Sequence, residues 1–113
     1  MKQKIDRPYL LHIKEAIEAI ETFIRSKTFD DFKKDDYFQS AIIRKLEVIG
    51  EAAKHVSPEI KMMAIEIPWE PIVAARNRLI HGYFSIDEER VWGMVIRDIP
   101  RLKEQILELL KIE

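Results

Sequence analysis

The chain has 113 residues, enough for one modest hydrophobic core and too few for two, so we expect a single domain over residues 1–113. It has no cysteine, which excludes disulfides, thiolate metal sites and a cysteine nucleophile. A net charge of −1 argues against bulk electrostatic capture of nucleic acid, so any contact with RNA needs a local basic patch.

The first part of the chain predicts one long helix from about residue 7 to residue 26. Its apolar residues step by three and four positions and form one stripe, made of Leu10, Ile13, Ile17, Ile20 and Ile24. Asp6 can cap the start of this helix. A short helical element bearing Phe29 and Phe32 should follow, with Thr28 as its cap.

A second long helix is predicted from about residue 36 to residue 56. Gly50 and the pair Ala52-Ala53 make its inner face thin, so another helix can approach closely there. A glycine inside a helix costs up to about 1 kcal/mol relative to alanine. Along one flank, three charged residues at helical spacing predict a structural ion-pair ladder rather than a catalytic group: Arg44, Glu47 and Glu51.

Two further long helices complete the pattern. After a short turn of helix that starts at Ser57-Pro58, a third helix should begin between Pro68 and Pro71 and run to about His81. Asp87 can cap a fourth, and Pro100 should kink that helix or divide it in two. Its stripe consists of Val91, Val95, Ile99, Leu102, Ile106 and Leu109.

These elements predict an all-α protein, a four-helix up-and-down bundle with short extra helical turns. Trp69 and Trp92 are expected to anchor its core or an interface. No apolar run approaches the roughly 20 residues that span a bilayer, and the first residues lack the apolar stretch of a signal peptide. We therefore expect a soluble cytoplasmic protein with no membrane partner.

The chemically richest stretch is residues 75–84, which brings together two arginines, an amide, an imidazole and a phenol: Arg76, Asn77, Arg78, His81 and Tyr83. RNA cleavage by attack of the ribose 2′-hydroxyl on phosphorus needs a base, an acid and a cation. His81 suits the first two roles and Arg76 the third. These two residues diverge by about 140° on a straight helix. A two-fold dimer would place two copies of each in one cleft and remove this difficulty.

The same stretch resembles a known signature. Arg76-x-x-x-x-His81-x-Tyr83 is similar to the R-x4-H-x-Y motif of the HepT-like toxins, which belong to the HEPN (higher eukaryotes and prokaryotes nucleotide-binding) superfamily. Residues 41–53 resemble the second conserved block of that family, and residues 67–69 resemble the lead-in to the motif. Trp92 and residues 98–102 also fit, so the resemblance covers nearly the whole chain.

The resemblance implies a HEPN-like bundle that acts as a homodimer, the toxin of a toxin–antitoxin pair. HEPN ribonucleases place their Arg and His motifs across a homodimer interface and need no metal, which implies Arg76 and His81 as the catalytic residues, with no metal or cofactor. In HepT-like toxins the motif tyrosine receives AMP from a partner antitoxin, an MntA-type minimal nucleotidyltransferase. Tyr83 occupies that position, and AMP on its phenol oxygen would silence the nuclease by charge and bulk.

Other readings of the motif stay open. The Arg-His-Tyr cluster could bridge a dimer interface without catalysis, or the chain could be a nucleotide-binding or adaptor subunit that docks a nucleotidyltransferase. Asn77 could fix the His81 tautomer or contact the RNA, and Arg78 is either solvated or in contact with phosphate. His12 and His55 have no neighbours at metal-ligand spacing, so they are expected in surface or packing roles.

Overall fold

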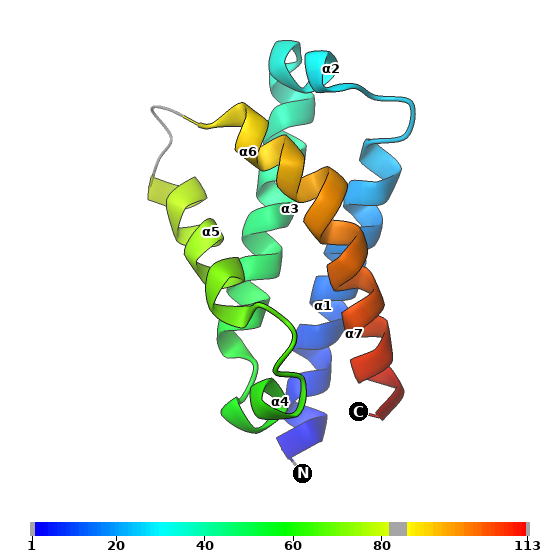
Figure 1. Ribbon diagram of the computed structural model, residues 1–113, viewed down its shortest axis with the longest axis vertical. Helices are drawn as coiled ribbons and strands as arrows, with labels where there is room; N and C mark the ends of the chain where they lie inside the picture. The colour runs from blue at the N-terminus through cyan, green and yellow to red at the C-terminus, as the bar shows by residue number, and fades with distance from the viewer. Residues whose placement is uncertain (1, 82–85, 113) are drawn as a thin grey trace.

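Four long helical elements run alternately up and down along the longest axis of the computed structural model, which describes residues 2–81 and 86–112, with side chains from residues 5–80 and 86–112 (Figure 1). Short helices lie at both ends. The elements are α1 (Lys2–Phe23), α2 (Phe29–Lys34), α3 (Asp36–His55), α4 (Pro58–Met63), α5 (Trp69–His81), α6 (Glu88–Gly93), η1 (Met94–Asp98) and α7 (Ile99–Ile112). The described residues contain no strand, and the predicted all-α up-and-down bundle is confirmed.

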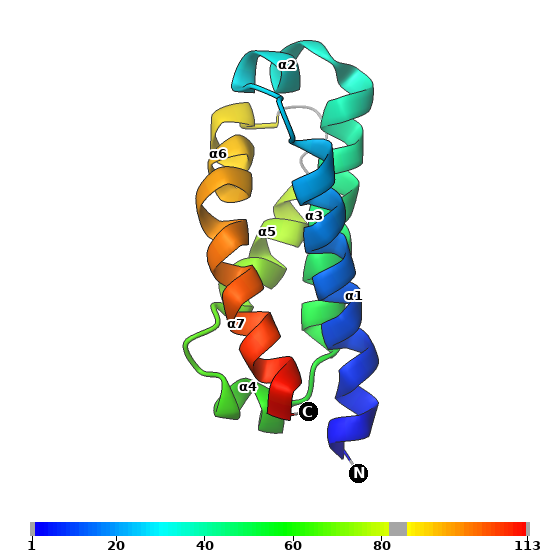
Figure 2. The same ribbon diagram turned by 90° about the vertical axis from the view of Figure 1, so that its right-hand side faces the viewer.

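The core follows the predicted stripes. In α7, four residues of the stripe are buried: Ile99, Leu102, Ile106 and Leu109. At one end of the bundle Trp92 packs on Phe32, with 5.3 Å between ring centroids, so this tryptophan is a core anchor as expected. Trp69 is also buried. In Figure 2, α1 and α3 run side by side, and α7 packs mainly on α1 while α5 packs mainly on α3.

The prediction that Asp6 caps the first helix was wrong. α1 begins at Lys2, and Asp6 lies inside it with its side chain 1% exposed. Its carboxylate accepts hydrogen bonds from Ser57 N at 2.8 Å and from Ser57 Oγ at 2.6 Å. Ser57 in turn caps α4. The carboxylate therefore has its donors at a distant helix start rather than in its own first turn, a pairing that makes its burial tolerable.

The last long element is interrupted in front of Pro100. After α6 the chain forms one π-helical segment, η1, and then returns to α-helix at Ile99. Because proline has no N–H to donate to the carbonyl four residues earlier, the wider π turn accommodates it. The expected division of this helix is confirmed, in the form of a π-helical segment that joins two α-helices. No helix in the described part of the chain is long and apolar enough to cross a membrane.

Candidate active site

Arg76, Asn77 and Arg78 lie on α5, and this helix is anchored at both ends. At its start Trp69 is buried, and its indole Nε1 donates a hydrogen bond to the Ala64 carbonyl at 3.1 Å. Near its other end Leu79 is buried in the core. The helix between them carries Arg76, Asn77 and Arg78, so the positions of these residues are set by the bundle and not by a loop.

The thin face predicted on α3 is the place where α5 lies. Gly50 is buried directly beneath Arg76: a Cβ added to Gly50 would overlap Arg76 Cβ and would lie 2.8 Å from Arg76 Cγ. It would also lie 3.2 Å from the Ile72 carbonyl oxygen. The expectation that Gly50 permits a close helix approach is confirmed, and the residue that uses the space is the proposed catalytic arginine.

The Arg76 guanidinium is held by two neighbours. Its Nη2 lies 2.6 Å from Glu51 Oε1, as a charge pair not aligned as a hydrogen bond, and its Nη1 donates to Asn77 Oδ1 at 2.9 Å. The side chain is 22% exposed. The Nε atom is buried and has no hydrogen-bond partner among the described residues. Arg76 is thus oriented on two sides while retaining unused N–H donors, as a group that clamps a phosphate would require.

Glu51 connects this arginine to a second group of side chains. Its Oε2 lies 3.0 Å from His55 Nε2, one helical turn further along α3. The His55 ring stacks on Tyr9 of α1, with 5.4 Å between ring centroids. The predicted ladder is therefore only half right: Arg44 pairs with Glu47 at 3.8 Å, whereas Glu51 pairs across the helix interface. The reason is that α5 brings a cation closer to Glu51 than Arg44 is.

These contacts lower the pKa of Glu51 below its ordinary value of 4.5. The hydrogen bond with His55 is the largest cause, burial opposes it, and the charges of Arg76, Lys54 and His55 add smaller effects. Glu51 is consequently a carboxylate over the whole neutral range. An ionised Glu51 can hold Arg76 in place, whereas a protonated one could not.

We expect Glu51 to make folding stability dependent on acid pH. A carboxylate whose folded-state pKa is depressed stabilises the protein above its ordinary pKa, and this contribution disappears as the pH falls through the folded-state pKa. Glu51→Gln should therefore flatten the loss of urea stability between about pH 5 and pH 3, measured by circular dichroism. The matched control is Glu15→Gln, the same chemical change at an exposed residue of α1. Identical pH profiles for both variants would contradict this role.

Sequence reasoning did not place Glu51, His55 and Tyr9 in this constellation: Glu51 was expected in a ladder with Arg44, and His55 in a surface or packing role. A usable signal was present, because Glu51 and His55 are one turn apart on the helix that carries the predicted close-contact glycine. The sequence pattern of α3 does not indicate which helix packs against it. Once α5 is known to lie on Gly50, Arg76 falls within reach of Glu51.

His81 is the last residue of α5, and its side chain lies outside the described residues, as does the whole of Tyr83. Their proximity to Arg76 and to Asn77 therefore stays a prediction. The backbone still carries information, since α5 is helical as far as His81. Over five residues a regular α-helix turns its side-chain directions apart by about 140°, and this sets the expected divergence of Arg76 and His81.

Comparison with known proteins places this geometry in context. The family model described as "Ribonuclease HepT-like" matches residues 13–109. A relative from Thermococcus cleftensis, named "Probable ribonuclease HepT", is 45% identical over 105 residues, which cover 93% of this chain and 96% of the relative. A relative from Caldanaerobacter subterraneus subsp. tengcongensis, named as a candidate RNase, is 36% identical over 110 residues, which cover 97% of this chain and 98% of the relative.

A third relative is longer. It comes from Methanocaldococcus jannaschii, and its name combines a gamma-glutamylcyclotransferase with a candidate RNase. Identity is 43% over 103 residues, or 91% of this chain, and the chain spans about half of that protein, 46% of its length. No solved structure matches the chain significantly.

Proposed function

This chain belongs to the HepT-like ribonuclease family, and from that premise we propose that it is a toxin that cleaves RNA internally, without a metal ion, through Arg76 and His81. The observation that carries the proposal is the arrangement of Arg76. Its guanidinium is fixed by Glu51 and Asn77, and the side chain stays 22% exposed. A preorganised cation with spare donors is suited to the charge that develops on a phosphorane.

The reaction that we propose is internal transesterification. The ribose 2′-oxygen attacks the adjacent phosphorus while His81 accepts the hydroxyl proton, and the bond from phosphorus to the 5′-oxygen breaks. A second histidine protonates the departing 5′-oxygen, so the products are a 2′,3′-cyclic phosphate and a free 5′-hydroxyl. Arg76 stabilises the phosphorane, and Asn77 and Arg78 support the site or contact the RNA.

The second histidine would come from a second copy of the chain. One chain supplies one His81, and the helical course of α5 turns Arg76 and His81 away from each other. A two-fold homodimer supplies two of each to a shared cleft and resolves both difficulties. Sedimentation equilibrium should accordingly give twice the chain mass of 13.4 kDa.

We further propose that a partner of the MntA type controls this activity through Tyr83. Its phenol oxygen would attack the α-phosphorus of ATP, releasing pyrophosphate and leaving AMP on the tyrosine. The added phosphate and adenosine would occupy the space beside Arg76 and His81 with negative charge. This modification blocks RNA from the site without unfolding the protein.

The test is cleavage of a mixed cellular RNA pool by the purified protein in excess EDTA. We expect cleavage to survive EDTA and to be lost in His81→Ala, with cyclic phosphate on the products. Mass spectrometry of the starting protein excludes a Tyr83 that already carries AMP. Loss of cleavage in EDTA would refute the metal-free mechanism. Absence of activity in unmodified protein, with or without added Mg²⁺, would favour an adaptor that docks a nucleotidyltransferase.

A further inference from the structure

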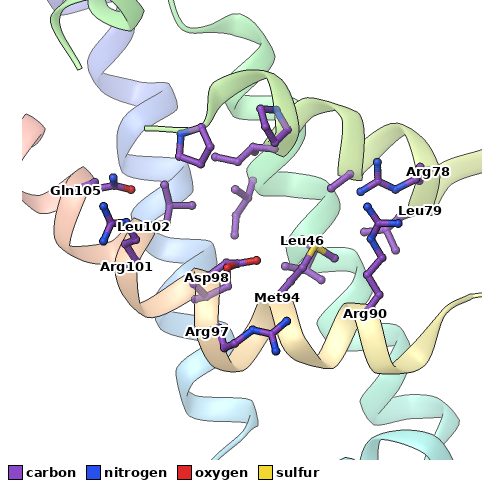
Figure 3. A pocket seen from close by; sticks show the side chains of 16 residues that line it. Leu46, Arg78, Leu79, Arg90, Met94, Arg97, Asp98, Arg101, Leu102 and Gln105 are labelled. Carbon is purple, nitrogen blue, oxygen red and sulfur yellow. The ribbon is translucent and has the colours of Figure 1, made fainter. Parts of the chain in front are cut away.

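A cavity of about 360 Å³ lies between α5 and the α6–η1–α7 element, and Arg76 is not among the residues that line it (Figure 3). Its floor is apolar, with Leu46 and Ile49 from α3 and Met94 from η1. Its rim is cationic. Four arginines from four successive elements line it: Arg78, Arg90, Arg97 and Arg101. We call this feature the arginine cleft.

The charge of the arginine cleft is locally unbalanced. The protein as a whole carries a net charge of −1, yet the cleft has four guanidinium groups and a single carboxylate, Asp98. In Figure 3, Arg78 and Arg90 point toward one another from α5 and α6 at one end of the cavity. No guanidinium of the four makes a hydrogen bond or ion pair within the described part of the chain. Facing like charges repel, and an anion between them would turn the repulsion into attraction.

The spacing of the arginines favours a chain of anions over a single one. Arg90, Arg97 and Arg101 follow one another along one helical element at intervals of seven and four residues, or about 10 Å and 6 Å of axial rise. Regularly spaced phosphates can follow such a row, and guanidinium forks match them in shape. No aromatic side chain of the described residues lines the cavity, so bases would pack on its floor by apolar contact and not by the aromatic stacking of many single-strand sites.

We propose that the arginine cleft binds the phosphates of single-stranded RNA next to the scissile bond, with bases against the apolar floor. The position fits, because Arg78 lies on α5 three residues before His81, a spacing that puts two positions on the same face of a helix, so a strand in the cleft can continue to the reactive site. This inference rests on the proposed function, since RNA is the ligand. It concerns residues outside the Arg76 and His81 pair, and therefore predicts binding that can be separated from cleavage.

The test is the binding of a fluorescein-labelled single-stranded RNA, followed by fluorescence anisotropy at several salt concentrations. All proteins carry His81→Ala so that the probe is not cut. Arg90→Ala/Arg97→Ala should weaken binding at least about tenfold and reduce the slope of log K against log salt by about 1.4, because each lost phosphate contact removes about 0.7. Arg90→Lys/Arg97→Lys keeps both charges and should retain most of the slope. Circular dichroism establishes that each variant is folded.

The control is Arg25→Ala/Lys61→Ala, which changes net charge equally at residues that do not line the cleft. Affinity and slope that are the same in the cleft variant and the control would overturn the proposal, as would absence of RNA binding in the parent. Displacement of the RNA by AMP at equal phosphate concentration would overturn it in favour of a free nucleotide. Binding that depends on the arginines, together with no cleavage of the RNA pool by the protein that retains His81, would support the cleft while refuting the nuclease.

Discussion

Replacing Arg76 with alanine is expected to lower the rate of RNA cleavage by about 10³-fold while the protein stays folded. Removing one preorganised donor to a developing oxyanion typically costs that much, and Arg76 supplies a full charge as well. Folding should tolerate the change, because Glu51 is 45% exposed and keeps its hydrogen bond with His55. The measurement is the single-turnover cleavage rate, compared with the urea midpoint of the same preparation.

Two further variants separate the charge of Arg76 from its position. Arg76→Lys retains the charge without the planar fork, and we expect an intermediate rate. Glu51→Gln keeps Arg76 but removes the charge that holds it, so it should lower the rate less than Arg76→Ala does. In a protein that already carries Glu51→Gln, adding Arg76→Lys should lower the rate only slightly further. A wild-type rate in Arg76→Ala would remove this residue from the reaction.

The second large effect is expected from Gly50→Ala. Alanine normally stabilises a helix by about 1 kcal/mol relative to glycine, yet here its Cβ would overlap Arg76 Cβ, which is fixed to the α5 backbone and cannot swing aside. The two helices must move apart. We expect a net loss of about 1–3 kcal/mol in the free energy of unfolding, together with a loss of cleavage, because Arg76 is displaced from Glu51.

Gly93→Ala provides a matched control for this substitution. The added Cβ would meet only the guanidinium end of Arg97, at 2.6 Å from Nη2, and this flexible end can move away. Gly93→Ala should therefore keep or raise the free energy of unfolding. Equal urea midpoints for the two alanine variants would show that α5 can shift away from position 50 at little cost in stability, contrary to this prediction.

Helical periodicity was sufficient to predict the four long elements and their buried stripes, because local spacing determines which face of a helix is apolar. It also located the thin face of α3 at Gly50. Periodicity does not indicate which helix packs on that face. The ion-pair partner of Glu51 comes from that helix, so it could not be predicted. The prediction that Asp6 caps its own helix was wrong for the same reason, since the residue that donates to its carboxylate lies 51 residues away in the chain. Long side chains that reach between elements depend on the completed packing.

The one-sided support of α5 has an energetic consequence. Among its described side chains the buried ones are Trp69 and Leu79, whereas α7 buries four along its length. Local opening of α5 should thus require less free energy than opening of the other long helices, and amide hydrogen exchange should be faster there than in α1, α3 or α7. A ligand or partner bound to the side of α5 that does not pack on α3 would add to this opening free energy. The helix that carries the motif is thereby the part of the bundle whose rigidity depends most on what is bound.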